Sequence, residues 1–158
     1  MDEKHQTLAE QIFSQFSFAL TEKGNIDPLY IMIMQDGNAI PIVIQSNNNV
    51  TMEMYINAAA NAAHEMGATA MFFVCEQMMI NKKKDDPEVQ ALLDGKIRAS
   101  QHPDAEDYLT LIYMTAEGDC ESLIAKIHRD PMGTKYTNEK EWIDGSITNI
   151  LIPWKESK

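Results

Sequence analysis

Two apolar runs, residues 29–34 and 39–44, enclose the dipeptide Asp36-Gly37 and constrain the fold of this chain more than any other feature. Runs of this length and composition are typical of β-strands. The Asp-Gly dipeptide between them predicts a hairpin, because both residues tolerate the positive φ angles of a type I′ turn. Pro41 lacks a backbone N–H donor, so we expect the second strand to lie at a sheet edge or to carry a bulge.

The first of these runs is apolar on both faces of the expected strand. Its alternating positions carry Leu29, Ile31 and Ile33 on one face, and Tyr30, Met32 and Met34 on the other. Antiparallel sheets usually leave one face to water. Either helices must therefore cover both faces of this strand, or a partner molecule covers one of them.

Apolar residues at helical spacing predict two helices. The first spans residues 3–22, where Leu8, Ile12, Phe16 and Leu20 recur at steps of four. The second follows Thr51, whose hydroxyl can cap its first turn. Its apolar face is rich in alanine and carries Met52, Ile56, Ala59, Ala60, Ala63 and Met66. Such small side chains allow a helix to approach a sheet closely.

The remaining elements complete an α+β pattern. Further strands are expected over residues 69–79, 108–115, 121–129 and 147–152. Residues 81–105 are expected to form a polar, less ordered excursion. We therefore expect a single α+β domain over residues 1–158, in which two main helices pack on one face of a largely antiparallel sheet of five to six strands. Residues 39–79 could also form one parallel crossover.

The charge is strongly negative and unevenly distributed. The chain has 24 acidic and 13 basic residues, which gives a formal net charge of −11. Residues 1–79 hold nine acidic and two basic side chains, whereas residues 80–158 hold fifteen and eleven. We expect no nucleic-acid partner and no anionic membrane surface, since both need clustered Lys and Arg. The acidic first half could meet a basic protein, and an acidic decoy that imitates nucleic-acid phosphates is a further alternative.

The cysteines and the N-terminal residues indicate the compartment. Cys75 and Cys120 lie too far apart for a CxxC motif and are too few for a disulfide framework. The start of the chain is too polar and acidic for a signal peptide, and no apolar stretch reaches the length of a membrane span. The sequence therefore predicts a protein of the cytoplasm.

Several familiar catalytic motifs lack their residues. His64-Glu65 would begin a zinc-binding His-Glu-x-x-His motif, but position 68 is alanine. The seven glycines are too scattered to form a phosphate-binding loop, and no Gly-x-Ser-x-Gly motif surrounds a serine. We therefore expect no cofactor and no bound metal.

A short acidic cluster stands before one of the expected strands. Asp104, Glu106 and Asp107 supply carboxylate oxygens that could bind a divalent cation, but the spacing is not that of an EF-hand. A solvated charged turn is the simpler interpretation.

Two functional hypotheses follow. The leading one is a non-enzymatic interaction module that binds another protein or its own copy through the sheet, because no catalytic set is complete. The alternative is a small enzyme with an unfamiliar carboxylate–histidine site. Its candidate catalytic residues are Glu76, which interrupts an apolar strand, and His64 and His128, provided that the three converge in one pocket.

Overall fold

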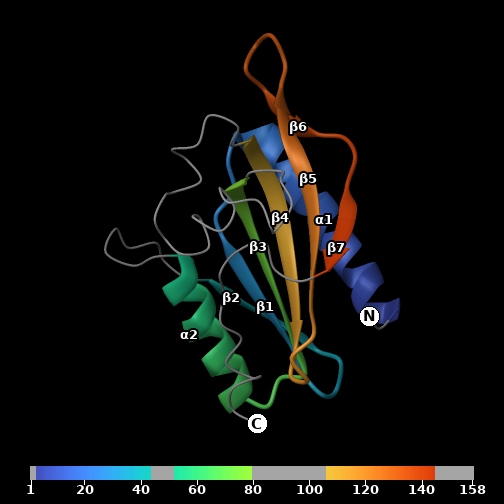
Figure 1. The fold of residues 1–158 in the computed structure, drawn as a ribbon, viewed down its shortest axis with the longest axis vertical. Helices are drawn as coiled ribbons and strands as arrows, with labels where there is room; N and C mark the ends of the chain where they lie inside the picture. Colours follow the sequence, from blue (N-terminus) through green and yellow to red (C-terminus); the bar gives the residue numbers. More distant parts are fainter. Residues whose placement is uncertain (1–2, 44–51, 80–105, 145–158) are drawn as a thin grey trace, which may run out of the picture.

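The computed structural model describes residues 3–43, 52–79 and 106–144 (Figure 1). Two helices and seven strands follow one another in the order α1 (Glu3–Lys23), β1 (Leu29–Ile33), β2 (Ala39–Val43), α2 (Met52–Glu65), β3 (Ala70–Met79), β4 (Glu106–Thr115), β5 (Cys120–Arg129), β6 (Lys135–Thr137) and β7 (Glu141–Asp144). The expected strand at 147–152 and the expected excursion at 81–105 lie outside the described residues.

The strands form one antiparallel sheet in the order β2-β1-β3-β4-β5-β6, with β7 also paired to β5. This confirms the predicted α+β class with a largely antiparallel sheet. The strand number rises to seven because β6 and β7 are short segments that the sequence patterns did not predict. Residues 39–79 contain the expected parallel pair of strands joined through α2, although the two strands are not neighbours in the sheet. β2 and β3 run in the same direction, but β1 lies between them and pairs with both.

The expectation that both helices pack on one face of the sheet is wrong, because α1 and α2 lie on opposite faces (Figure 1). Ala9, Ile12 and Phe13 of α1 pack against one apolar cluster, and the alanines of α2 pack against the other. The physical reason is the doubly apolar first strand. Residues 30–33 are at most 8% exposed, so β1 is covered from both sides by the chain's own helices.

The β1–β2 hairpin forms where Asp36-Gly37 predicts it, but with a different turn. The N–H of Met34 donates to the Asn38 carbonyl over 2.9 Å, and the N–H of Gly37 donates to the Met34 carbonyl over 2.9 Å. Gly37 has a φ of 88°, while no non-glycine residue in the described ranges has a positive φ. A type I′ turn needs positive φ at two residues, so this three-residue loop with a bulge at glycine replaces it.

The prediction for Pro41 is confirmed, since β2 is the outermost strand on its side of the sheet. Met34 and Asn38 form a hydrogen-bonded pair, and in an antiparallel ladder only every second residue of β2 bonds to β1. The N–H groups of residues 39, 41 and 43 therefore point away from β1, to the outer edge of the sheet. Pro41 removes the central one of these donors. This edge is therefore poorly suited to accept a further strand.

Candidate functional site

Glu76 lies on the α1 face of the sheet, near the C-terminal end of β3. It continues the alternation of Phe72 and Val74, which both belong to the cluster under α1. The side chain is 25% exposed, so it is neither open to solvent nor fully buried. Its position near the end of β3 brings it within reach of the α1–β1 connection and of β6.

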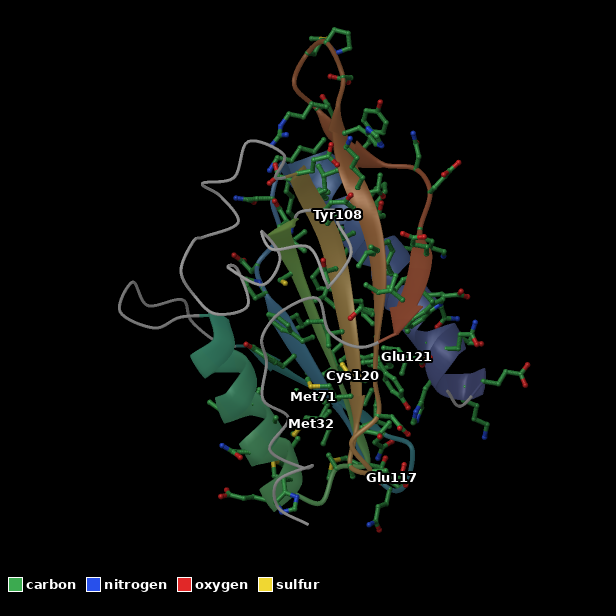
Figure 2. All side chains as sticks on the ribbon, viewed as in Figure 1. Met32, Met71, Tyr108, Glu117, Cys120 and Glu121 are labelled. Atoms are coloured by element: carbon green, nitrogen blue, oxygen red, sulfur yellow. The ribbon has the colours of Figure 1, made fainter. Side chains whose placement is uncertain are left out.

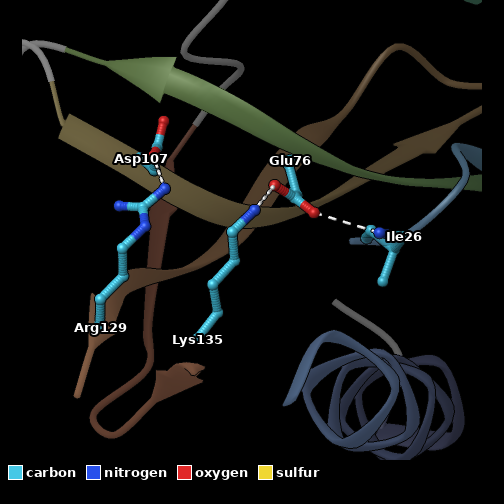
Figure 3. A network of polar contacts seen from close by, with 5 residues as sticks. All are labelled: Ile26, Glu76, Asp107, Arg129 and Lys135. Carbon is cyan, nitrogen blue, oxygen red and sulfur yellow. Dashed lines mark hydrogen bonds and ion pairs between the residues drawn. The ribbon is translucent and has the colours of Figure 1, made fainter. Parts of the chain in front are cut away.

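Both carboxylate oxygens of Glu76 have partners (Figure 3). Oε1 accepts the backbone N–H of Ile26 over 3.1 Å, and Oε2 accepts a bond from Nζ of Lys135 over 3.3 Å. Beside it, Arg129 donates to Asp107 over 2.9 Å. Glu76 therefore links β3 to the α1–β1 connection and to β6. Because both carboxylate oxygens take part in these structural contacts, Glu76 is not directed at a substrate.

His128 lies on the opposite face of the sheet. Its neighbour Ile127 belongs to the cluster under α1, so the His128 side chain points to the α2 face. The imidazole stacks on the ring of Tyr136 from β6, with 5.4 Å between ring centroids and 28° between planes. His128 also lines a hollow of about 700 Å³, together with Tyr108, Ile124, Ala125, Lys126, Asn138, Glu139, Lys140 and Glu141.

This hollow lies beside a bulge in the outer edge of the sheet. Thr137 of β6 opposes Ile127, whereas Glu141 of β7 opposes Ile124. Three steps along β5 thus correspond to four steps along the outer segment, which places one extra residue in 138–140. Such bulges push the chain out of the ladder and are frequent at sheet edges and binding sites. Here the bulge supplies one wall of the hollow.

Two polar groups of the hollow, Tyr108 and Lys126, hold their protons more firmly than usual. Burial, followed by the neighbouring Glu106 carboxylate, raises the pKa of Tyr108, so the phenol keeps its proton. Its hydroxyl donates to Glu106 over 3.4 Å. Lys126 donates to Glu106 over 2.9 Å, and this bond raises the pKa of the lysine. The hollow therefore offers donors for a polar ligand and a charged lysine, but no activated base among these two.

The three candidate catalytic residues do not share a pocket. His64 is exposed in the last turn of α2, next to the start of β3. Glu76 stands six residues along β3 from Ala70, which corresponds to roughly 20 Å at the rise of a strand. His128 is separated from Glu76 by the sheet itself. An acid–base mechanism that needs all three within hydrogen-bonding reach has no geometric basis in this arrangement.

The acidic cluster is also divided by the strand geometry. Asp104 lies outside the described residues, and Glu106 and Asp107 point to opposite faces of β4, where they pair with Lys126 and Arg129 respectively. Across the described ranges, no three side chains of His, Cys, Asp or Glu gather in a way that could hold a metal ion.

Sequence reasoning found His128 but missed the hollow around it. The alternation of Ser122, Lys126 and His128 on one face of a strand was a usable signal for a polar surface there. The polar triplet 138–140, placed between the two short segments that become β6 and β7, was the only local sign of the bulge. Neither sign identifies the strand edge against which the triplet lies.

No protein-family model matches this chain, and no curated protein or solved structure matches it either. The geometry of the described residues is therefore the basis for a functional proposal. None of the helices in that part of the chain has the length and apolar character needed to cross a membrane.

Proposed function

We propose that this chain is a non-enzymatic interaction module that binds a protein partner, or a second copy of itself, through residues 127–137. These residues form the end of β5, the following turn and β6, and we name them the β5–β6 arm. The arm projects beyond the rest of the sheet at one end of the molecule (Figure 1). Its tip carries Met132, and this residue is the single observation on which the proposal rests.

Met132 is 92% exposed, the highest value among the large apolar side chains of the described residues. An ordered turn holds it in this position. The Asp130 carboxylate accepts the N–H groups of Met132 and Thr134, each over 2.9 Å. A flexible thioether on a rigid turn suits an adaptable protein contact, because the backbone loses little entropy on binding.

The base of the arm is fastened to the domain from the α1 face. Lys135 pairs with Glu76, Arg129 pairs with Asp107, and the hydroxyls of Ser17 in α1 and Thr137 are hydrogen-bonded. These contacts hold the arm at a defined angle to the sheet. A pre-positioned arm is what a module needs if it presents one apolar residue to a partner.

Two features of the fold direct the proposal to the arm rather than to the flat sheet. The apolar faces of β1 are covered by α1 and α2, so they do not require a partner. The free edge of β2 lacks its central donor at Pro41, which disfavours the addition of a strand. Cys75 and Cys120, both free thiols, support a reducing compartment such as the cytoplasm as the place of binding.

The test compares the wild-type chain with Met132→Asp and with Met66→Asp, a matched change at another exposed methionine. Each chain is immobilised for capture from cell extract, and each is measured by light scattering at micromolar concentration. We expect a captured protein or a dimer with the wild type and Met66→Asp, and neither with Met132→Asp. A monomer that retains nothing, or a Met132→Asp chain that behaves as the wild type, contradicts the proposal.

The alternative remains a small enzyme, and the hollow around His128 is the observation in its favour. Such an enzyme would use His128 with Tyr108 and Lys126 rather than with Glu76 or His64. Turnover in a broad panel of hydrolase substrates that is lost in His128→Asn and kept in His64→Asn would favour this alternative over the interaction module.

A further inference from the structure

Four sulfur-containing side chains form a continuous row across the sheet. Met32 of β1 is the register partner of Met71 in β3, Met71 is the partner of Met114 in β4, and Met114 is the partner of Cys120 in β5. Figure 2 shows Met32, Met71 and Cys120 in this part of the sheet, at the opposite end from Tyr108. All four side chains belong to, or pack against, the cluster on the α2 face.

The surroundings of this row are soft and apolar. Met32, Met71 and Met114 are at most 1% exposed, and Cys120 is partly exposed at the end of the row. The neighbouring α2 residues in the same cluster are the small side chains Ala59, Ala60 and Ala63, and Met34 packs against its margin. Neighbouring strands lie about 4.8 Å apart, so flexible thioether side chains on adjacent strands can turn their sulfur atoms toward one common point.

We propose that Met71, Met114 and Cys120 form a binding site for a soft monovalent cation of the Cu(I) type, with Met32 as the adjoining thioether. Thioether and thiolate sulfur are the ligands that Cu(I) prefers, while hard cations require oxygen ligands that the row lacks. On binding, the S–H bond of Cys120 breaks, a sulfur–metal bond forms, and the proton passes to solvent. The oxidation state of the metal does not change, and the thiolate neutralises the charge of the ion.

The position of Cys120 provides an entry route. It is the first residue of β5, directly after the β4–β5 turn, and it is the only member of the row with solvent exposure. An ion can therefore bind first at this thiol and then gain the thioethers of Met114 and Met71. This site is independent of the β5–β6 arm, which lies at the other end of β5.

The test uses the full chain under reducing, oxygen-free conditions, with Ag(I) as an air-stable probe and with Cu(I) in competition against a chromophoric chelator. We expect one equivalent to bind, with release of one proton in weakly buffered solution and a higher melting temperature. Met114→Leu and Met71→Leu keep side-chain volume and the thiol. Each should weaken binding by about tenfold or more, and Cys120→Ser should do the same.

Matched controls separate this site from scattered thiol or thioether binding. Met66→Leu and Met132→Leu change exposed methionines, and Cys75→Ser changes the other, buried thiol. All three variants should bind Cu(I) with the affinity of the wild type. The X-ray absorption spectrum of the wild-type chain with Cu(I) should show three sulfur atoms bound to the metal. The proposal is overturned by an absence of stoichiometric binding, by Met114→Leu and Met71→Leu affinities equal to the wild type, or by loss of binding in a control variant.

Discussion

The two faces of the sheet are built from the same strands but have different cores. The α1 face is packed with branched and aromatic side chains such as Ile31, Phe72 and Leu111, and it is closed at one end by the Glu76–Lys135 ion pair. The α2 face contains Met32, Met71, Met114 and two cysteines, along with the stacked rings of Tyr30 and Phe73. Over residues 58–65 of the helix that covers it, the buried side chains are alanines.

This difference separates two ways of filling a core. Branched and aromatic side chains have few low-energy rotamers, so the α1 face depends on a specific fit between shapes. Methionine is unbranched and can adjust to irregular space, so the α2 face tolerates change more readily. At the helix interface, however, Ala59, Ala60 and Ala63 are buried, so we expect a larger side chain there to clash with the sheet. The faces should therefore respond in opposite ways to cavities and to added volume.

The largest expected effect comes from removing one aromatic ring from each face. Phe72 and Phe73 are adjacent, fully buried and directed to opposite faces. We expect Phe72→Ala to lower the free energy of unfolding by about 5 kcal/mol and Phe73→Ala by about 3 kcal/mol, because the methionines can relax into the second cavity. Urea denaturation followed by circular dichroism measures both. Equal losses, or a larger loss at Phe73, would show that the faces do not differ in this respect.

The next effect tests the close approach of α2 to the sheet. Ala60 is fully buried, whereas Ala58 is exposed on the same helix. Ala60→Leu should lower the free energy of unfolding by about 2 kcal/mol through overpacking. Ala58→Leu should change it by less than about 0.5 kcal/mol. Thermal denaturation of the two variants gives the comparison. An Ala60→Leu chain as stable as the Ala58→Leu chain would contradict the close approach of α2 to the sheet.

An effect of similar size distinguishes the ion pairs on the two faces. Glu76 and Lys135 are 25% and 21% exposed, while Glu106 and Lys126 are 42% and 45% exposed. Glu76→Ala leaves the N–H of Ile26 without this acceptor and should lower the free energy of unfolding by about 2 kcal/mol. Glu106→Ala removes a more solvated pair and should cost less than about 1 kcal/mol. A reversed order in chemical denaturation would contradict a structural role for Glu76.

The smallest effect is an alkaline loss of stability that arises on the α2 face. Burial, reinforced by the neighbouring Glu76, raises the pKa of Cys75 from 9.0 to about 12. Above pH 9 the thiol ionises in the unfolded chain while the folded chain keeps its proton. The stabilisation is therefore complete below that pH and declines as the pH rises, by about 1 kcal/mol between pH 9 and 10.

Cys75→Ala removes this contribution, so its free energy of unfolding should decline less steeply over the same range. Denaturant titrations of the wild type and the variant at each pH measure the difference between the two slopes. Parallel slopes would mean that the thiol is more accessible to solvent than its burial indicates.

Local patterns were sufficient to predict most elements of the described fold. The observed bounds of α1, β3 and β5 differ by one residue at a single end from those expected. The hairpin at Asp36-Gly37 was found because its signal lies within four residues. The short segments β6 and β7 were missed, because three or four residues carry no clear period and are strands only through pairing with β5.

The candidate site was less predictable than the fold. His128 was identified, and the structure places it in a hollow, but its neighbours come from β4 and from the bulge after β6. Glu76 was singled out for its unusual position in an apolar strand. Its partners, Ile26 and Lys135, are 50 and 59 residues away along the chain, so no local pattern could name them.

The amino-acid sequence by itself determined where both helices and the longer described strands form, that β1 must be covered on both faces, and that Pro41 belongs at an edge. These properties depend on side-chain period and on backbone donors, which are local. Only the tertiary structure decided that the helices lie on opposite faces, that β1 separates β2 from β3, and that three methionines and a cysteine share one row. These arrangements depend on strand order and register, which are set by packing between residues distant in the chain.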